Sequence, residues 1–247
     1  QNLLKKSQSI MNNIKEKIKE VKNSIVAIGF SPELNKMTII GSGFIIKNDG
    51  KILILSSAHL YNKLKPEYIP NLMGMVIDKE ERDGLTCYKW LLLELLKKDD
   101  KDDIAIFQIK DYKPDLLTEI GSGLELGDSE GVEIGEDVYF IGFPYAAQLI
   151  NDGFGVTLIV NRGIISNIKR DGVDPNQKRN WLIVDAISNP GNSGCPLIST
   201  ESNKVIGVMT IAFRTQSRVI KELDIREPMH IAGAKPINLA KPLLDNL

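Results

Sequence analysis

The sequence predicts an all-β fold of two packed β-barrels or sandwiches, with helix at the ends of the chain. About a dozen short runs rich in β-branched and aromatic residues follow residue 24. They fall into two groups, separated by residues 111–131, which are rich in glycine, proline and acids. Neither group alternates strands with the long helical patterns that a parallel sheet requires, and this favours antiparallel strands.

Composition narrows the class of protein further. The 247 residues are enough for one large domain or two lobes, and 43% hydrophobic with 26% charged residues is typical of a soluble globular chain. The net charge of −1 provides no basic field for nucleic acid. No apolar run reaches the roughly 18 residues of a membrane-spanning helix. We therefore expect neither nucleic acid nor a membrane as a partner.

The cysteines and the N-terminus bear on the compartment. Only Cys87 and Cys195 are present, which excludes a disulfide scaffold and favours a reducing compartment. The polar, basic N-terminus lacks the apolar core of a signal peptide, so a cytoplasmic location is favoured. The chain starts at Gln1, as a fragment or a processed form would.

The N-terminal unit, residues 1–23, is predicted to belong to an amphipathic helix over residues 3–25. Lysine and glutamate occupy much of its polar face. The favoured interpretation is a single helix packed on the domain that follows. The alternative is a coiled coil of about three heptads, which would mediate self-association or hold a regulatory partner. The two heptad positions hold Leu4, Met11, Ile18 and Ile25, and Ser7, Ile14 and Val21.

The first lobe is predicted over residues 24–118. Asn48-Asp49-Gly50 is a strong hairpin signal. Residues 61–84 carry prolines and charges and are predicted as a long surface loop. The apolar run Tyr88–Lys97 fits a strand or a helix, and its β-rich neighbourhood favours a strand. The predicted strands are Ile25–Phe30, Met37–Ile40, Gly43–Lys47, Lys51–Ser56, Tyr88–Lys97 and Ile104–Lys110.

A linker over residues 119–131 leads to a second lobe over residues 132–236. Glycine-rich turns separate its short apolar runs, and no internal repeat is present. Residues 237–247 are predicted to close the chain as a short helix. The predicted strands of this lobe are Asp137–Gly142, Val156–Val160, Gly163–Ile168, Leu182–Ile187, Pro196–Ser199, Val205–Ala212 and His230–Ala234.

The glycine-rich stretch Asn189–Leu197 is the most informative part of the sequence. Its tight turn can hold the Ser193 hydroxyl outward while the backbone N–H groups of Gly191 and Ser193 converge, the arrangement of a nucleophile with an oxyanion hole. Taken alone, the stretch fits an ordinary hairpin loop equally well. The residues upstream of it favour the catalytic interpretation.

A serine nucleophile needs a base, and the base needs an orienting carboxylate. His59 ends an apolar strand, and Asp103 directly precedes another, Ile104–Phe107. Asp102 leaves the choice of acid slightly open. The order His59, Asp103, Ser193 is that of the double β-barrel proteases. Using His230 as the base would require an α/β-hydrolase, whose alternating helices and parallel strands are missing.

The chain resembles a trypsin-like serine peptidase of the HtrA/Deg type. The matching motifs occur in family order over roughly residues 24–245, and no PDZ module follows them. These motifs are Gly41-Ser42-Gly43-Phe44-Ile45-Ile46, Ser57-Ala58-His59-Leu60, Asp103-Ile104-Ala105-Ile106, Gly135-Glu136-Asp137-Val138-Tyr139-Phe140-Ile141-Gly142-Phe143-Pro144, Asn161-Arg162-Gly163-Ile164-Ile165-Ser166, Pro190-Gly191-Asn192-Ser193-Gly194 and Val205-Ile206-Gly207-Val208.

This resemblance implies two perpendicular six-stranded antiparallel β-barrels of the chymotrypsin/trypsin-like fold, with the active site between them. His59 would be the general base and then the acid, Asp103 its orienting carboxylate and Ser193 the nucleophile. Gly191 and Ser193 would form the oxyanion hole. Thr210, Ile211 and Ala212 would pair with the backbone of an extended polypeptide substrate.

Further positions are assigned by the same resemblance. Ile187 would form the floor of the primary pocket, with Ala232 and Gly233 nearby, which favours a small or medium apolar P1 residue. Asp185 would favour a basic P1 residue, but a structural role is the favoured interpretation for it. Cys195 replaces a family glycine and is interpreted as a small buried filler. Asn192 replaces the aspartate of secreted zymogens, so their switch is expected to be absent. The segment from Tyr61 to Asp102 is long enough for a lid or docking loop.

The sequence thus predicts a serine endopeptidase that uses no cofactor or metal. The alternative is a catalytically silent, protease-like module for peptide binding or scaffolding. Residues 3–25 remain available for self-association under either prediction.

Overall fold

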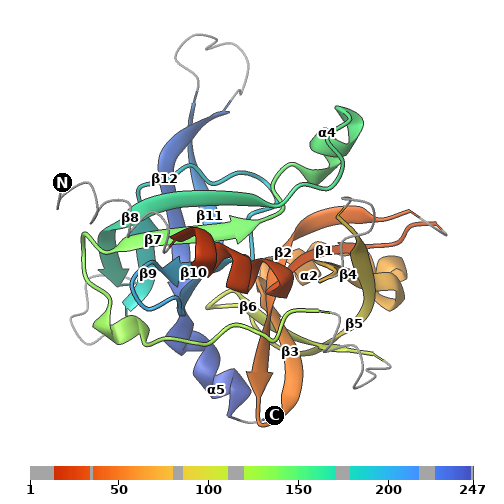
Figure 1. Ribbon diagram of the computed structural model, residues 1–247, viewed down its shortest axis with the longest axis horizontal. Helices are drawn as coiled ribbons and strands as arrows, with labels where there is room; N and C mark the ends of the chain where they lie inside the picture. Colours follow the sequence, from red (N-terminus) through yellow and green to blue (C-terminus); the bar gives the residue numbers. More distant parts are fainter. Residues whose placement is uncertain are drawn as a thin grey trace.

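The computed structural model contains two closed barrels of six antiparallel strands each, as the sequence predicts (Figure 1). It describes residues 14–33, 36–79, 86–110, 120–170, 179–216, 226–245 and 247. One apolar core fills each barrel, and a third joins them, with Phe44 from the first barrel and Tyr139 from the second both fully buried. The candidate site residues lie where the barrels meet.

The first barrel has the strand order β1-β2-β3-β6-β5-β4. The β2–β3 hairpin turns at Asp49 and Gly50, whose φ angles of 48° and 79° are those of a type I′ turn. The predicted Asn48-Asp49-Gly50 turn is therefore confirmed. The strands are β1 (Ile25–Phe30), β2 (Thr38–Asn48), β3 (Lys51–Ser56), β4 (Leu72–Ile77), β5 (Tyr88–Asp99) and β6 (Ile104–Ile109).

The prediction of a loop over residues 61–84 is wrong. This segment contains the end of helix α2 (Ala58–Asn62), a 3-10 helix, η2 (Pro66–Asn71), and β4. Because β4 pairs with both β1 and β5, it closes the barrel and buries its apolar side chains. The six residues of β4 are therefore barrel wall and not part of a surface loop.

The second barrel has the strand order β10-β11-β12-β9-β8-β7. Helix α4 (Ala146–Asn151) lies in the β7–β8 connection, so the prediction of helix only at the chain ends is wrong at α2 and α4. The chain closes with the predicted short helix, as η4 (Ile237–Ala240) and α5 (Lys241–Leu244). The strands are β7 (Asp137–Gly142), β8 (Ile159–Arg170), β9 (Arg179–Val184), β10 (Pro196–Ser199), β11 (Val205–Gln216) and β12 (Arg226–Pro236).

Residues 14–21 are helical and continue into η1 (Lys22–Ser24), whereas residues 1–13 of the predicted helix lie outside the described residues. Ile14 and Ile18 pack against the core that joins the barrels, and Val21 is buried in it. The Lys17 ammonium donates hydrogen bonds to the carbonyls of Thr200 and Glu201, at 2.5 and 2.8 Å. This part of the helix therefore packs on its own domain, as the favoured interpretation predicts.

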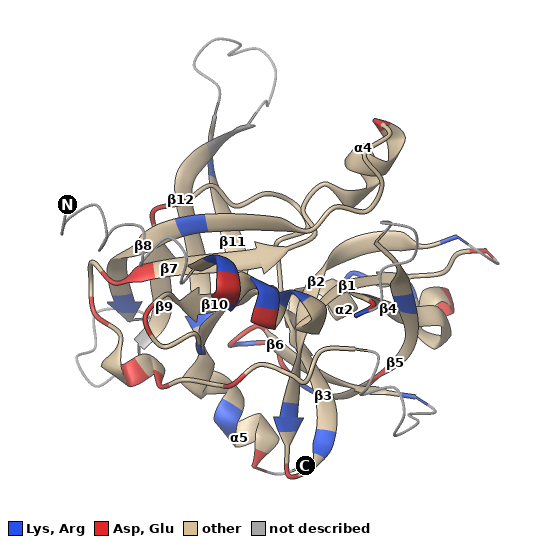
Figure 2. Ribbon diagram, viewed as in Figure 1, with Lys and Arg blue, Asp and Glu red and all other residues tan. Residues whose placement is uncertain are grey.

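Charge is dispersed over the fold. Basic and acidic residues are interspersed on both barrels and on the N-terminal helix (Figure 2). Among the described residues, no helix has the length and apolar character needed to cross a membrane.

Candidate active site

Strand pairing brings His59 and Asp103 together. His59 lies in α2, directly after β3, and Asp103 directly precedes β6. The two strands are paired, with Ser56 opposite Ala105. The end of one strand and the start of its antiparallel neighbour meet at the same edge of the barrel, so residues 44 positions apart become neighbours.

The carboxylate of Asp103 binds His59 through both of its oxygens. Oδ2 lies 2.8 Å from His59 Nδ1, and Oδ1 accepts the backbone N–H of His59 at 2.7 Å. The carbonyl of Asp103 also accepts the N–H of Ala58, at 3.2 Å. Of the two adjacent acids, Asp103 and not Asp102 contacts the imidazole.

Two consecutive tight turns hold Ser193. The N–H of Asn192 donates to Asn189 O, and the N–H of Cys195 donates to Asn192 O, both at 3.0 Å. Gly191 and Gly194 are the third residues of these turns, with φ angles of 101° and 85°. Because the third position of a type II turn needs positive φ, glycine is the fitting residue at both places.

The first barrel supports the Ser193 turn from behind. The N–H of Ser42, on β2, donates to Ser193 O at 2.8 Å. The buried Ser42 hydroxyl donates to Gly191 O at 2.7 Å and accepts the N–H of Phe143 at 2.9 Å. A Cβ on Gly194 would collide with Ser42 O. Sequence reasoning missed this role of Ser42, although a serine between two glycines of a buried strand is a signal of close backbone approach.

The peptide groups of the turn leave two N–H groups available. The carbonyl of Pro190 accepts the N–H of Tyr145 at 2.8 Å, and in a trans peptide the N–H of Gly191 then points the opposite way. Among the described residues, neither the N–H of Gly191 nor that of Ser193 has a hydrogen-bond acceptor. Both candidate oxyanion donors are thus unoccupied beside the Ser193 side chain.

The Ser193 hydroxyl makes one hydrogen bond to the described residues, a long one of 3.5 Å to Thr210 O. Ser193, Gly191 and His59 line the same cavity of about 330 Å³, together with Phe30 and Leu64. The serine and the histidine therefore face one space at the junction of the barrels, although the resting hydroxyl is directed to β11.

The predicted substrate-binding residues lie on and near β11. The β10–β11 pairing involves β11 residues only up to Val208, whereas Thr210, Ile211 and Ala212 follow beyond it. The side chain of Ile211 is exposed, and those of Thr210 and Ala212 are half-buried.

The predicted pocket residues differ in exposure. Ile187 is half-buried, and Ala232 is buried. A Cβ on Gly233 would lie 2.8 Å from the Ile211 side chain, so the glycine permits this close approach. The side chain of Asp185 is exposed.

Two further residues of the turn are fully buried. Cys195 packs in the core of the second barrel, as the filler interpretation predicts, and burial raises the pKa of its thiol. The side-chain amide of Asn192 has no hydrogen-bond partner among the described residues. His230, the histidine that sequence reasoning set aside, is exposed on β12.

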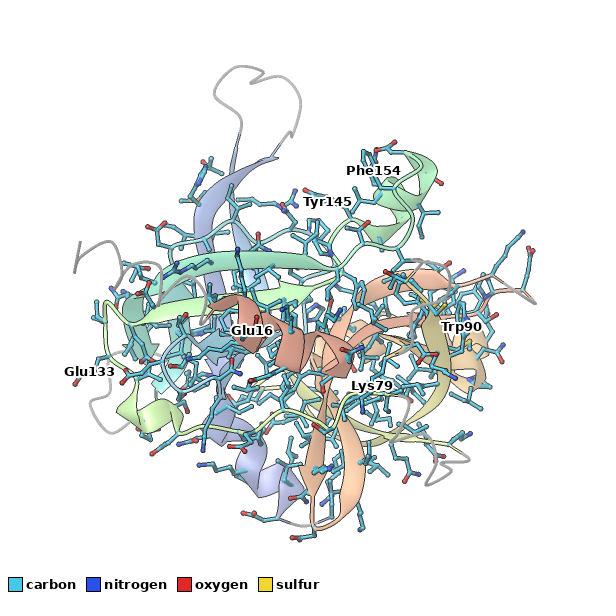
Figure 3. All side chains as sticks on the ribbon, in the orientation of Figure 1. Glu16, Lys79, Trp90, Glu133, Tyr145 and Phe154 are labelled. Carbon is cyan, nitrogen blue, oxygen red and sulfur yellow. The ribbon has the colours of Figure 1, made fainter. Side chains whose placement is uncertain are left out.

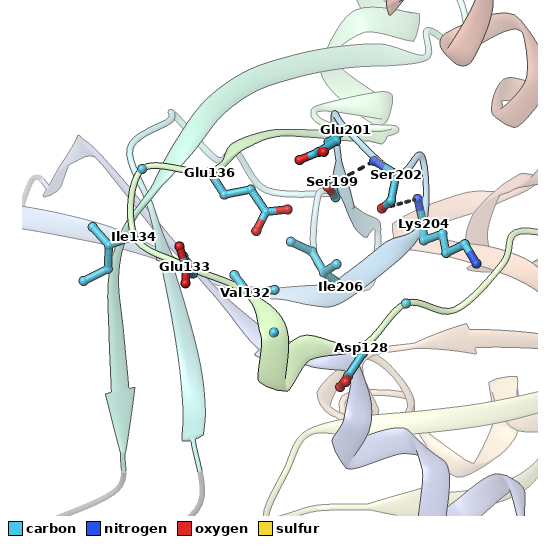
Figure 4. Close-up of a pocket in the computed structure, with 13 residues that line it drawn as sticks. Asp128, Val132, Glu133, Ile134, Glu136, Ser199, Glu201, Ser202, Lys204 and Ile206 are labelled. Atoms are coloured by element: carbon cyan, nitrogen blue, oxygen red, sulfur yellow. Dashed lines mark hydrogen bonds between the residues drawn. The ribbon is translucent and has the colours of Figure 1, made fainter.

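Two other features lie outside the candidate site. A cavity of about 770 Å³ on the second barrel is lined by the carboxylates of Asp128, Glu133, Glu136 and Glu201 and by none of the candidate catalytic residues (Figure 4). The connection around α4 projects from the barrels and carries the exposed rings of Tyr145 and Phe154 (Figure 3).

Comparisons with known proteins agree with this geometry. A family model described as trypsin-like peptidase domain matches residues 41–208. The chain is 34% identical over 176 residues to serine protease HTRA1 of Xenopus tropicalis, covering 69% of this chain and 31% of that protein. It is 32% identical over 214 residues to a probable periplasmic serine endoprotease DegP-like of Rickettsia conorii, covering 86% and 34%.

Two more matches extend the comparison. The magnetosome formation protease MamE of Paramagnetospirillum magneticum is 29% identical over 184 residues, covering 74% of this chain and 21% of that protein. The crystal structure of Deg5 has a similar fold, with a TM-score of 0.63 and 21% identity, covering 94% of this chain and 92% of that one. The chain spans 21% to 34% of the length of the three relatives compared by sequence.

Two six-stranded barrels with a serine turn, a histidine and an aspartate at their junction define the class. The chain belongs to the family of trypsin-like peptidase domains. Within that family it resembles the HtrA type, as its sequence similarity to HTRA1 and to a DegP-like endoprotease indicates.

Proposed function

We propose that this domain is a serine endopeptidase that hydrolyses extended or unfolded polypeptides through an acyl-enzyme intermediate. The observation that carries the proposal is the two-point hydrogen bonding of Asp103 to His59 in the cavity that Ser193 lines. The barrel junction supplies this arrangement from three distant segments of the chain.

His59 acts first as a general base. Asp103 holds the proton of the imidazole on Nδ1, which leaves Nε2 free to take the proton of Ser193 Oγ as that oxygen attacks the scissile carbonyl. The hydroxyl turns from Thr210 O toward His59 for this step. His59 then donates the proton to the leaving amine, and water hydrolyses the resulting ester by the same route in reverse.

The N–H groups of Gly191 and Ser193 stabilise the tetrahedral oxyanion. Loss of one such donor typically raises the barrier by about 3 kcal/mol. Donors that are fixed before the reaction need no reorganisation during it. Ser42 donates to the carbonyl of Gly191, and Tyr145 donates to the carbonyl of Pro190. These two hydrogen bonds fix the peptide groups on either side of Gly191. This support favours an oxyanion hole that is formed at rest.

The substrate pairs with Thr210, Ile211 and Ala212 by adding a strand to β11. The apolar Ile187 sets a preference for small or medium apolar P1 residues, whereas the exposed Asp185 is the residue that would favour a basic one. Cleavage of peptide libraries that vary only at P1 tests this preference. A preference for lysine or arginine would contradict it.

The second candidate is a catalytically silent peptide-binding module. The long Ser193–Thr210 hydrogen bond favours it, since the hydroxyl rests on β11. Ser193→Ala separates the two functions, because an endopeptidase loses turnover by several orders of magnitude while a binding module keeps its peptide affinity. Peptide binding without cleavage by the unaltered chain would establish the second candidate.

Ile14, Ile18 and Val21 already pack on the domain. We therefore propose self-association only through those residues of 3–25 that do not contact the domain. Light scattering on the full chain and on a chain shortened to begin at Asn23 tests this, and an equal number of protomers in both contradicts it. The cytoplasmic location stays a prediction.

A further inference from the structure

Lys235 is a buried cation next to the candidate site. It lies on β12 and is 3% exposed, although its neighbours in this part of the strand are alanine, glycine and proline. Its ammonium lies 4.1 Å from the centroid of the Trp181 ring, on β9, which attracts a cation through its π-electron face. A charged amine this deeply buried is costly unless an anion compensates it.

The compensating anion is Asp102, in the first barrel. The ammonium lies 3.8 Å from Asp102 Oδ1, an oxygen that is itself buried and has no hydrogen-bond donor among the described residues. The backbone N–H of Asp102 donates to Asp99 Oδ1 at 2.9 Å, which shapes the turn before β6. Lys235 thus ties a strand of the second barrel to this turn of the first.

The next residue in that turn is Asp103, and its backbone is strained. Asp103 has a φ of 52°, which lies in the left-handed region. This conformation is energetically unfavourable for a residue that has a side chain. Such a conformation persists only where its surroundings fix it. The His59 contacts fix it on one side, and the Lys235–Asp102 pair holds the preceding residue on the other.

We infer that Lys235 is a positioning residue for the candidate triad. Through Asp102 it holds the turn that aims the Asp103 carboxylate at His59, and it does so from the opposite barrel. The pair thereby fixes the two barrels relative to each other where Ser193 of the second barrel must approach His59 of the first. This inference rests on the proposed endopeptidase function of the same site.

Three variants separate positioning from stability. Lys235→Met keeps the length of the side chain but leaves Asp102 buried without its cation, so both the melting temperature and kcat fall. Asp102→Asn removes the anion. The double variant leaves no unpaired charge, so the melting temperature recovers, whereas kcat stays low by about 10- to 100-fold with KM within about twofold.

A matched control is Lys204→Met. The ammonium of Lys204, a residue of the β10–β11 turn, lies 3.1 Å from a carboxylate oxygen of Glu125 in the linker, and the two side chains are 46% and 77% exposed. Because the pair is exposed and neither residue lines the cavity of His59 and Ser193, its loss should change kcat by less than about twofold. A role for Lys235 that is only structural predicts that kcat of the double variant recovers together with its melting temperature.

A readout without turnover keeps this inference separate from the proposed function. In a Ser193→Ala background, the proton on His59 Nδ1 should give a downfield NMR resonance, and His230→Gln assigns it because the chain has only two histidines. Lys235→Met and the double variant should shift or broaden it, and Lys204→Met should not. An unchanged resonance in the double variant would overturn the inference. If the resonance responds but the unaltered chain cleaves no peptide, the positioning role stands and the endopeptidase proposal fails.

Discussion

The carboxylate of Asp103 engages His59 twice, at the imidazole Nδ1 and at the backbone N–H, at 2.8 and 2.7 Å. The second hydrogen bond fixes the carboxylate relative to the main chain, so the first can fix the ring. With their side chains 26% and 15% exposed, the pair is partly shielded from water, which strengthens the interaction.

Asp103→Asn tests this relationship. The amide can place an N–H where Oδ2 now accepts, which favours the imidazole tautomer that cannot deprotonate Ser193. We expect kcat to fall by about 10³- to 10⁴-fold with little change in KM. Hydrolysis of a fluorogenic peptide measures both. Asp100→Asn is the control. Among the described residues the Asp100 carboxylate binds only Lys98 and Asn62, at the surface, so this variant should keep full activity.

Gly191→Ala tests the oxyanion hole. Its φ of 101° strains an alanine, and the new Cβ would lie 2.5 Å from Phe143 O, so the turn must move and misplace the Gly191 N–H. We expect kcat to fall by about 100-fold or more while peptide affinity in the Ser193→Ala background is kept. Gly50→Ala has a positive φ of 79° but open space around its Cβ. Gly50→Ala should destabilise the fold by about 1 kcal/mol without changing kcat. An equal loss of kcat in Gly191→Ala and Gly50→Ala would argue against the oxyanion role of Gly191.

Ser42→Ala tests the support behind the turn. It removes the donor to the Gly191 carbonyl and the acceptor of the buried Phe143 N–H, so both groups lose a partner. We expect kcat to fall by about tenfold and the free energy of unfolding by about 1 to 3 kcal/mol. Denaturant titration and peptide kinetics measure these changes. Ser166→Ala, at an exposed serine of β8, is the control, and unchanged kinetics in Ser42→Ala would count against a preformed turn.

Those parts of the fold that depend on local sequence signals can be predicted from the sequence. Asp49-Gly50 marks a type I′ turn by residue type alone, and the order of His59, Asp103 and Ser193 indicates a double barrel. Strand β4 was missed because Leu-Met-Gly-Met-Val-Ile holds few β-branched residues and follows a proline-rich segment. Helix α2 has only five residues, too few for a helical period.

The contacts that support the site could not be predicted in this way. Ser42 and Gly191 are 149 positions apart, and nothing in either local segment specifies that one hydroxyl will meet the other residue's carbonyl. The choice between the neighbouring acids Asp102 and Asp103 likewise depends on the backbone conformation at Asp103, whose φ is 52° and which the local sequence does not specify.

Cys195 should be chemically inert, although it lies two residues from Ser193. Burial raises the pKa of its thiol, so the thiolate that reacts with iodoacetamide is scarce in the folded protein. The unfolded thiol ionises above about pH 8.5, so this group lowers the free energy of unfolding as the pH rises beyond that value. Mass spectrometry at pH 8 should find Cys87, which is half-buried, alkylated before Cys195. Prior modification of Cys195 in the folded chain would contradict its burial.

The most direct test of the central claim is covalent labelling of the folded chain with a fluorophosphonate, which reacts with a serine only where a base and an oxyanion hole activate it. We expect one label per chain, mapped by mass spectrometry to Ser193 and lost in Ser193→Ala, Asp103→Asn and Gly191→Ala. Absence of label from Ser193 in a chain that is folded and binds peptide, with or without added peptide, would contradict the claim that this turn is a serine nucleophile with its oxyanion hole.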